Sequence, residues 1–220
     1  MVSRLLALCL FGLSALFSVA AAQAQVAAPV PVAPVAIDPE NVLHLDLSTG
    51  GRVSILMNPA LAPGHVERIK TLAREGFYNG IVFHRVIDGF MAQTGDPTGT
   101  GAGGSKLPDL KAEFSASPHL RGTVSMARTG EPDSANSQFF ICFSPRFMLD
   151  NKYTVFGRVM AGMQYVDAIA RGEPPAQPDK IVRASIGADN VPPPDFSAMA
   201  KPAEPAAAAI SVDDLNKPLN

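Results

Sequence analysis

The strongest constraint on the fold is a period-two pattern that begins near residue 43. Leu43, Leu45 and Leu47 alternate with polar residues, and the alternation resumes at 53–55 after the turn-forming sequence Thr49-Gly50-Gly51. Successive side chains of a β-strand point to opposite faces, so this pattern predicts two half-buried antiparallel strands joined by a tight turn. The sequence therefore predicts that the folded domain begins with a β-hairpin.

Further segments predict a mainly β domain with two helices. Apolar and β-branched runs at 81–87, 139–143, 153–159 and 181–186 are typical of strands. Residues 63–74 and 162–170 carry apolar side chains at helical spacing, and Pro63 and Gly76 suit the start and the end of the first of these helices. Many short strands with two helices favour a barrel or sandwich whose openings the helices cover.

The two ends of the chain differ in composition from the middle. Residues 1–24 contain Arg4, the apolar run 5–21 and Ala22-Gln23-Ala24, a pattern typical of a cleaved secretory signal peptide. A transmembrane anchor is the alternative, although the run is short for a span. Residues 25–41 are rich in Pro, Ala and Val and predict an extended linker. Residues 188–220 predict a largely disordered Pro/Ala-rich tail with a weak helix at 206–215, which leaves one domain at 42–187.

Charge and cysteine content limit the partners and the compartment. The net charge is −2 and no basic block occurs, which disfavours binding to nucleic acid. After the signal peptide no apolar run is long enough for stable membrane insertion. Cys9 lies in the signal peptide, so Cys142 is expected to be a buried, inert thiol without a disulfide partner. The mature protein is expected to be periplasmic or secreted, and to be a monomer.

Three patterns that resemble catalytic or ligand sites lack the context that such sites require. The sequence 99–104 has the spacing G-x-G-x-x-G, but no strand precedes it and no helix begins at its end. The histidines are scattered without a second ligand at metal spacing. Ser125 and Ser137 lack the surroundings of a nucleophilic serine. Nucleotide, metal and hydrolase sites are therefore not supported, and the glycines are expected to allow tight turns near a bound peptide backbone.

Arg85 is the residue that the local pattern singles out. It lies among apolar side chains in the stretch Phe83-His84-Arg85-Val86-Ile87-Asp88-Gly89-Phe90-Met91-Ala92-Gln93. Strand alternation would put Arg85 on the same face as Phe83 and Ile87, with His84 facing away. A surface salt bridge is the alternative, but the apolar surroundings favour an arginine that lines a pocket. Such a site can hold a peptide and polarise an amide, yet it offers no strong nucleophile.

The same stretch resembles the signature of the cyclophilins, the cyclosporin-sensitive class of peptidyl-prolyl cis–trans isomerases. The resemblance continues through Gly95-Asp96 and the glycine-rich loop, and further matching blocks lie at 122–128, 137–141 and 149–159. The blocks follow the family's order over residues 42–187. The resemblance implies a mainly β fold, namely a closed eight-stranded antiparallel β-barrel capped by two α-helices.

The resemblance also implies the site residues. Arg85 matches the family's catalytic arginine, and Gln93 matches the glutamine that hydrogen-bonds the substrate carbonyl. The implied substrate-binding residues are Phe90, Met91, Ala127, Arg128, Thr129, Gln138, Phe140, Leu149 and Tyr153. No metal ion or other cofactor is implied.

Three positions depart from the common pattern of the family. Arg128 replaces an asparagine of eukaryotic members, in a segment that binds peptide largely through its backbone. Tyr153 stands where many members have a histidine, and Met148 stands where eukaryotic members often have a tryptophan that contacts cyclosporin. The chain has no tryptophan, so strong cyclosporin binding is not expected. Met148 and Tyr153 make the chain similar to bacterial members of the family, and the signal-peptide pattern at 1–24 adds the expectation of an exported member.

The implied activity is the isomerisation of X–Pro bonds in unfolded or partly folded exported polypeptides. Rotation about such a bond breaks amide resonance, with an uncatalysed barrier of about 20 kcal/mol. A permanently charged donor such as Arg85 can stabilise the twisted amide more than the planar one, without a covalent intermediate. The alternative is a proline-peptide-binding chaperone module with negligible turnover. The joint presence of Arg85, Gln93 and the pocket residues favours the enzyme.

Overall fold

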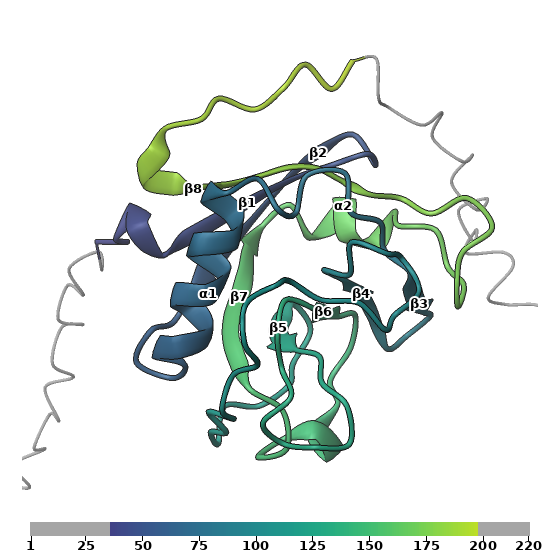
Figure 1. Ribbon diagram of the computed structural model, residues 1–220. Helices are drawn as coiled ribbons and strands as arrows, with labels where there is room; N and C mark the ends of the chain where they lie inside the picture. The colour runs from purple at the N-terminus through teal and green to yellow at the C-terminus, as the bar shows by residue number, and fades with distance from the viewer. Residues whose placement is uncertain (1–35, 198–220) are drawn as a thin grey trace, which may run out of the picture. The chain divides into compact units, whose positions relative to one another are not determined.

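The computed structural model describes residues 36–197, and the fold below refers to that part of the chain (Figure 1). The predicted signal peptide and the predicted helix at 206–215 lie outside the described residues, as do most of the predicted linker and residues 198–220 of the predicted tail.

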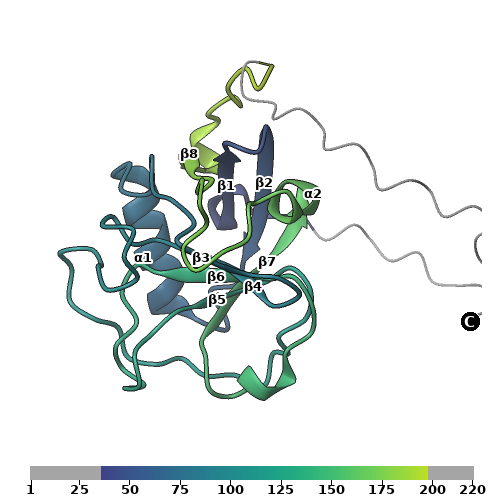
Figure 2. The ribbon, with the colours of Figure 1, turned by 90° about the vertical axis from the view of Figure 1, so that its right-hand side faces the viewer.

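Eight antiparallel strands form one sheet in the order β3-β4-β6-β5-β7-β2-β1-β8. The strands are β1 (Val42–Leu47), β2 (Gly51–Met57), β3 (Arg85–Ile87), β4 (Met91–Thr94), β5 (Thr123–Met126), β6 (Phe139–Cys142), β7 (Val155–Ala161) and β8 (Ile181–Ile186). The helices are α1 (Pro63–Arg74) and α2 (Met163–Asp167), with short 3-10 turns η1 (Pro39–Asn41), η2 (Phe147–Leu149) and η3 (Gly187–Asp189). The two views place α1 against β8 and α2 against β2 (Figures 1 and 2).

The expectation of a closed barrel is wrong, because the curled sheet is open between its end strands β3 and β8. The segments that precede β3 and β8 contact each other, through an isolated bridge between Val82 and Lys180. The strands themselves do not pair, since β3 has three residues and its outer edge pairs at Val86 with Gly172 instead. The sheet is therefore a half-barrel that the preceding segments only partly close.

The helices and strands agree with the sequence pattern to different degrees. The predicted hairpin is present as β1 and β2, and α1 has the predicted bounds. The helix predicted at 162–170 is shorter, because α2 ends at Asp167. The strand predicted at 81–87 begins only at Arg85, so strand alternation does not extend back to Phe83. Phe83 is fully buried in the main core, whereas Arg85 lies on the outer face, and the prediction that the two share a face is wrong.

The inner face of the sheet carries the main core. The buried side chains there include Leu43 and Ile55 of the hairpin and Phe139, Ile141 and Phe156 further along the chain. Along β6 all four residues are buried, but only Phe139 and Ile141 belong to this core. Phe140 and Cys142 alternate to the other face and belong to a second, smaller apolar cluster. Both faces of β6 are thus packed, and the second cluster is where a site can form.

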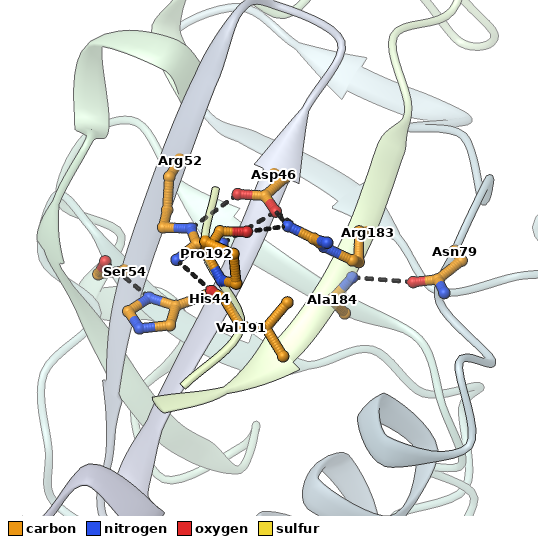
Figure 3. Close-up of polar contacts among 9 residues, drawn as sticks. All are labelled: His44, Asp46, Arg52, Ser54, Asn79, Arg183, Ala184, Val191 and Pro192. Atoms are coloured by element: carbon orange, nitrogen blue, oxygen red, sulfur yellow. Dashed lines mark hydrogen bonds and ion pairs between the residues drawn. The ribbon is translucent and has the colours of Figure 1, made fainter. Parts of the chain in front are cut away.

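Asp46 joins three strands and the chain beyond β8 on the outer face (Figure 3). Its carboxylate is 1% exposed and accepts hydrogen bonds from Arg52 Nε at 2.7 Å and Arg183 Nη2 at 3.0 Å. The same two guanidinium groups donate to the carbonyl oxygens of Val191, at 3.0 Å, and Pro192. The predicted tail begins at residue 188, and these contacts attach its first residues to the sheet.

Replacing Asp46 by alanine is expected to lower the free energy of unfolding by about 1–3 kcal/mol, because two partly buried arginines lose their acceptor. Urea denaturation of Asp46→Ala and the parent protein measures the difference. Glu67→Ala, at an exposed position of α1, is the control and is expected to stay within about 0.5 kcal/mol. An unchanged unfolding midpoint for Asp46→Ala would contradict the proposed role of this cluster.

Candidate functional site

The register of three neighbouring strands puts the predicted site residues in one row on the outer face. Arg85 of β3 pairs with Gln93 of β4, and Gln93 pairs with Phe140 of β6. Residues directly opposite each other in a sheet point to the same face, with Cβ atoms roughly 5 Å apart. The row therefore brings together a cation, an amide and an aromatic ring. The first and the last of these, Arg85 and Phe140, are 55 residues apart in the sequence.

A pocket of about 100 Å³ opens beside this row, above the second apolar cluster. Met91 and Phe140 are almost fully buried at its base, and the rings of Phe140 and Tyr153 meet edge to face at 5.9 Å. The complete lining is Arg85, Phe90, Met91, Gln93, Ala127, Arg128, Phe140, Leu149 and Tyr153. These are nine of the eleven residues predicted from the sequence. An apolar recess of this size suits a ring the size of proline.

Arg85 lies at the rim of the pocket and is 43% exposed. Its Nε donates a hydrogen bond to Glu173 Oε2 at 2.7 Å. The sequence left two alternatives for this residue, a pocket-lining arginine and a surface salt bridge, and the structure shows both at once. His84, which precedes β3, is almost fully buried beside Gly101 of the glycine-rich loop, and burial lowers its pKa.

A larger pocket of about 410 Å³ adjoins the first one. Gln93, Ala127 and Arg128 line both pockets, and the two remaining predicted residues, Thr129 and Gln138, line the larger one. Gln93 Nε2 donates to Gln138 Oε1 at 2.9 Å, which leaves Gln93 a second N–H for a ligand. The structure thus brings all eleven predicted residues to one continuous surface.

The glycine-rich loop forms one side of the larger pocket and is held by Asp96. The Asp96 carboxylate accepts hydrogen bonds from the backbone N–H groups of Thr98, Thr100 and Gly101, at 2.6 to 3.0 Å. Burial alone would raise the Asp96 pKa, but the hydrogen bonds from Thr98 and the loop glycines lower it to about 2. A nucleotide phosphate would need these N–H groups, so the loop is not built as a phosphate site. Gln138 Nε2 also bonds the loop, at the carbonyl oxygens of Gly101 and Gly103.

Arg128 braces the segment that separates the two pockets. Its guanidinium donates to the carbonyl oxygens of Lys152, Thr129 and Gly130, and it stacks over the Tyr153 ring at 4.6 Å. The Arg128 guanidinium is therefore already engaged by backbone oxygens and by an aromatic ring. The arrangement supports the expectation that this segment meets a peptide through its backbone rather than through the Arg128 side chain.

Behind the pocket, His119 lies between an acid and a serine. Its Nδ1 is 2.8 Å from Asp150 Oδ1, and its Nε2 is 3.1 Å from Ser125 Oγ. The sequence around Ser125 lacks the pattern of a nucleophilic serine, yet the fold brings a histidine and a serine together. His119 and Ser125 are fully buried, and Ser125 Oγ donates to the Thr154 carbonyl, so a substrate cannot reach the pair. The His119 ring stacks on Phe140 instead and supports the wall of the pocket.

Other titratable groups near the pocket offer no nucleophile or metal site. Cys142 is buried beside Met91, its cross-strand neighbour, and burial raises the pKa of its thiol to about 12. Within residues 36–197, no group of three or more His, Cys, Asp or Glu side chains is placed to hold a metal ion. In the same range no helix has the length and hydropathy to cross a bilayer.

Several residues of the site were not found from the sequence. Asp109, Ser134 and Asn136 line the larger pocket, and Asn136 holds the glycine-rich loop through Ser105. Asn136 directly precedes a block that the resemblance did include, so its position was a usable signal. Glu173, the partner of Arg85, lies 88 residues away along the chain, and no local pattern marks it.

Comparison with known proteins identifies the family to which the chain is similar. The family "Cyclophilin type peptidyl-prolyl cis-trans isomerase/CLD" matches residues 44–186. A protein of Brucella suis biovar 1 named "Probable peptidyl-prolyl cis-trans isomerase" is 51% identical over 70% of this chain and 86% of its own length. The "Peptidyl-prolyl cis-trans isomerase-like 1" of Aspergillus niger is 43% identical over 64% of this chain and 91% of its own.

Solved structures show the same fold. The cyclophilin AquaCyp293 from Hirschia baltica has a TM-score of 0.65 and 32% identity, covering 71% of this chain and 77% of its own. A cyclophilin-type isomerase of Cryptosporidium parvum, crystallised in the presence of the dipeptide Ala-Pro, has a TM-score of 0.62 and 26% identity, covering 66% of this chain and 98% of its own. The chain therefore belongs to the cyclophilin-type peptidyl-prolyl cis–trans isomerases, and its activity is the isomerisation of X–Pro bonds.

Proposed function

We propose that the pocket of about 100 Å³ holds the proline ring of an X–Pro segment while Arg85 catalyses rotation of the preceding bond. The observation that carries this proposal is the position of one permanently charged donor at the rim of an apolar pocket. Met91 and Phe140 form the base of that pocket, and Phe90 and Leu149 complete its apolar walls. No covalent intermediate is required, because the reaction breaks no covalent bond.

Arg85 acts by binding the twisted amide more strongly than the planar one. As the X–Pro bond rotates, the nitrogen loses conjugation and becomes a hydrogen-bond acceptor. A guanidinium donor aimed at that nitrogen stabilises the twisted state selectively, and each 1.4 kcal/mol of preference gives about a tenfold gain in rate. Glu173 occupies Nε of Arg85, which leaves the two Nη groups to face the substrate.

The rest of the peptide would be held while the bond rotates. Gln93 and Ala127 line both pockets, so a peptide with its proline in the small pocket continues over the larger one. Gln93 can donate its free N–H to a peptide carbonyl, and the segment 127–129 offers its backbone at the edge of both pockets. The presence of Ala-Pro in the Cryptosporidium parvum crystals supports an X–Pro ligand for this chain as well.

The substrates proposed are unfolded or partly folded polypeptides outside the cytoplasm, bound by a monomer. Residues 1–24 carry the features of a cleaved signal peptide, which supports export to a periplasm or secretion. Unfolded chains arrive in such a compartment with slowly exchanging X–Pro bonds, whose uncatalysed half-times are tens to hundreds of seconds. An isomerase there would accelerate the folding of exported proteins.

Arg85→Ala is expected to lower kcat/KM for an Ala-Pro peptide at least about 100-fold with the fold retained, because the donor to the amide nitrogen is lost. A protease-coupled or NMR exchange assay measures the rate, and circular dichroism checks the fold. Arg85→Lys is the matched variant: it keeps the charge, loses the planar fork of donors, and is expected to recover only part of the activity. Near-normal kcat/KM in Arg85→Ala would overturn the proposed mechanism.

Phe90→Ala is expected to raise KM more than it lowers kcat, because it removes one wall of the proline pocket but no donor. The expected loss in kcat/KM is about 5- to 50-fold, as for the loss of a large apolar contact. Met160→Ala is the control, since Met160 is an exposed apolar residue of β7 outside both pockets. An unchanged KM in Phe90→Ala would place the proline ring elsewhere.

The full chain produced in a Gram-negative host is expected to reach the periplasm and lose residues 1–24. N-terminal sequencing of the periplasmic protein should begin at Gln25. Replacing the central apolar run with Leu10→Arg should leave the chain in the cytoplasm at full length. Recovery of the unchanged full-length chain from the membrane fraction would instead identify residues 5–21 as an anchor.

A further inference from the structure

The edge of the catalytic strand is covered by three residues from a distant loop. Arg171, Gly172 and Glu173, here called the strap, follow α2 and lie beside β3, where Gly172 bridges to Val86. The N–H of Val86 donates to the Gly172 carbonyl at 2.8 Å, and the N–H of Gly172 donates to the Val86 carbonyl at 2.9 Å. This reciprocal pair sets an antiparallel register, which places Glu173 opposite Arg85.

Charged side chains fix the strap at both of its ends. Glu173 pairs with Arg85 at 2.7 Å, and Arg171 pairs with Asp88, in the turn after β3, at 3.1 Å. The Arg171 guanidinium also lies 4.2 Å from the centre of the Phe143 ring. The segment of β3 and its turn carries a cation and then an anion, and the strap carries the complementary charges opposite them. A shift of the strap along β3 would therefore bring like charges closer together. The charges therefore reinforce the register that the backbone sets.

Gly172 is the one residue of the strap whose conformation demands glycine. Its φ is +147°, and a Cβ atom there would lie 2.6 Å from Pro175 Cα and 2.8 Å from the Pro174 carbonyl oxygen. Separations below about 3 Å cannot be relieved by rotating a side chain when the neighbours are backbone atoms. The turn that delivers Glu173 to Arg85 thus depends on a position without a side chain.

We propose that Glu173 is a positioning residue for catalysis, one that fixes the plane of the Arg85 guanidinium. This inference rests on the proposed role of Arg85. A free arginine side chain samples many rotamers, whereas one hydrogen bond at Nε, close to the stem, fixes the direction of the Nη groups beyond it. Among the described residues Arg85 makes no other side-chain hydrogen bond, so Glu173 alone sets its orientation.

Because the Arg85–Glu173 ion pair is partly exposed, its loss should affect turnover rather than the stability of the fold. Arg85 is 43% and Glu173 51% exposed, and ion pairs of that kind contribute little to the stability of a fold. Its loss should therefore leave the unfolding transition almost unchanged. The turnover step should respond instead, because it depends on the angle at which Arg85 meets the amide nitrogen.

The test is a double-mutant cycle on Glu173 and Arg85, with kcat and KM measured separately for an Ala-Pro peptide. Glu173→Ala should lower kcat about two- to fivefold and change KM less than about twofold. Glu173→Gln keeps an acceptor oxygen and should recover most of the loss. In the Arg85→Ala background, Glu173→Ala should cause no further loss. Glu67→Ala, an exposed acid on α1, should leave kcat unchanged.

Two results would overturn the proposal. A rise in kcat for Glu173→Ala would mean that the carboxylate masks Arg85. An equal loss of kcat in the Arg85→Ala background would mean that Glu173 acts through the fold. Retention of activity by Arg85→Ala itself would refute the catalytic role of Arg85 instead, so the two failures are distinguishable. Gly172→Ala, with thermal unfolding as its check, should lower kcat at least as much as Glu173→Ala because it displaces the whole strap.

Discussion

The antiparallel register of β3, β4 and β6 is the constraint on which the rest of the site depends. It sets Arg85, Gln93 and Phe140 side by side on the outer face, while Val86, Ala92 and Ile141 enter the core on the other. A slip of one residue in any of the three strands would turn a site residue into the core. The main core that fixes the register thus also fixes the catalytic geometry, although none of its residues lines either pocket.

Most polar side chains around the row of Arg85, Gln93 and Phe140 bond to one another, and few of their N–H groups stay available to a ligand. Gln138 binds Gln93 and the glycine-rich loop, Arg128 is occupied by backbone carbonyls, and Glu173 occupies one nitrogen of Arg85. Asp96 accepts hydrogen bonds from the backbone N–H groups of the loop that could otherwise bind an anion. What remains toward the pocket is an apolar recess, one amide and the end of one guanidinium. That set can orient a proline peptide and stabilise a twisted amide.

Much of this was predictable from the sequence, and the exceptions have physical reasons. The hairpin, α1 and the set of site residues follow from short-range patterns and from motifs that resemble a family. The closure of the barrel was predicted wrongly because it depends on the edge of β3, which the distant Gly172 occupies. Phe83 was assigned to the wrong face because strand alternation was extended across an irregular segment. His119, Asp150 and Ser125 form a cluster that only the folded chain reveals, and Glu173 joins Arg85 across 88 residues without a local signal.

A crystal structure with a bound X–Pro peptide would show where the proline ring lies and what Arg85 contacts. We expect the proline ring to contact Phe90, Met91 and Phe140, and an Nη atom of Arg85 to lie within about 3.5 Å of the proline nitrogen or the preceding carbonyl oxygen. Glu173 is expected to keep its hydrogen bond to Arg85 Nε in the complex. A proline ring bound in the larger pocket, or an Arg85 side chain turned away from the X–Pro bond, would show that Arg85 does not catalyse the rotation as proposed.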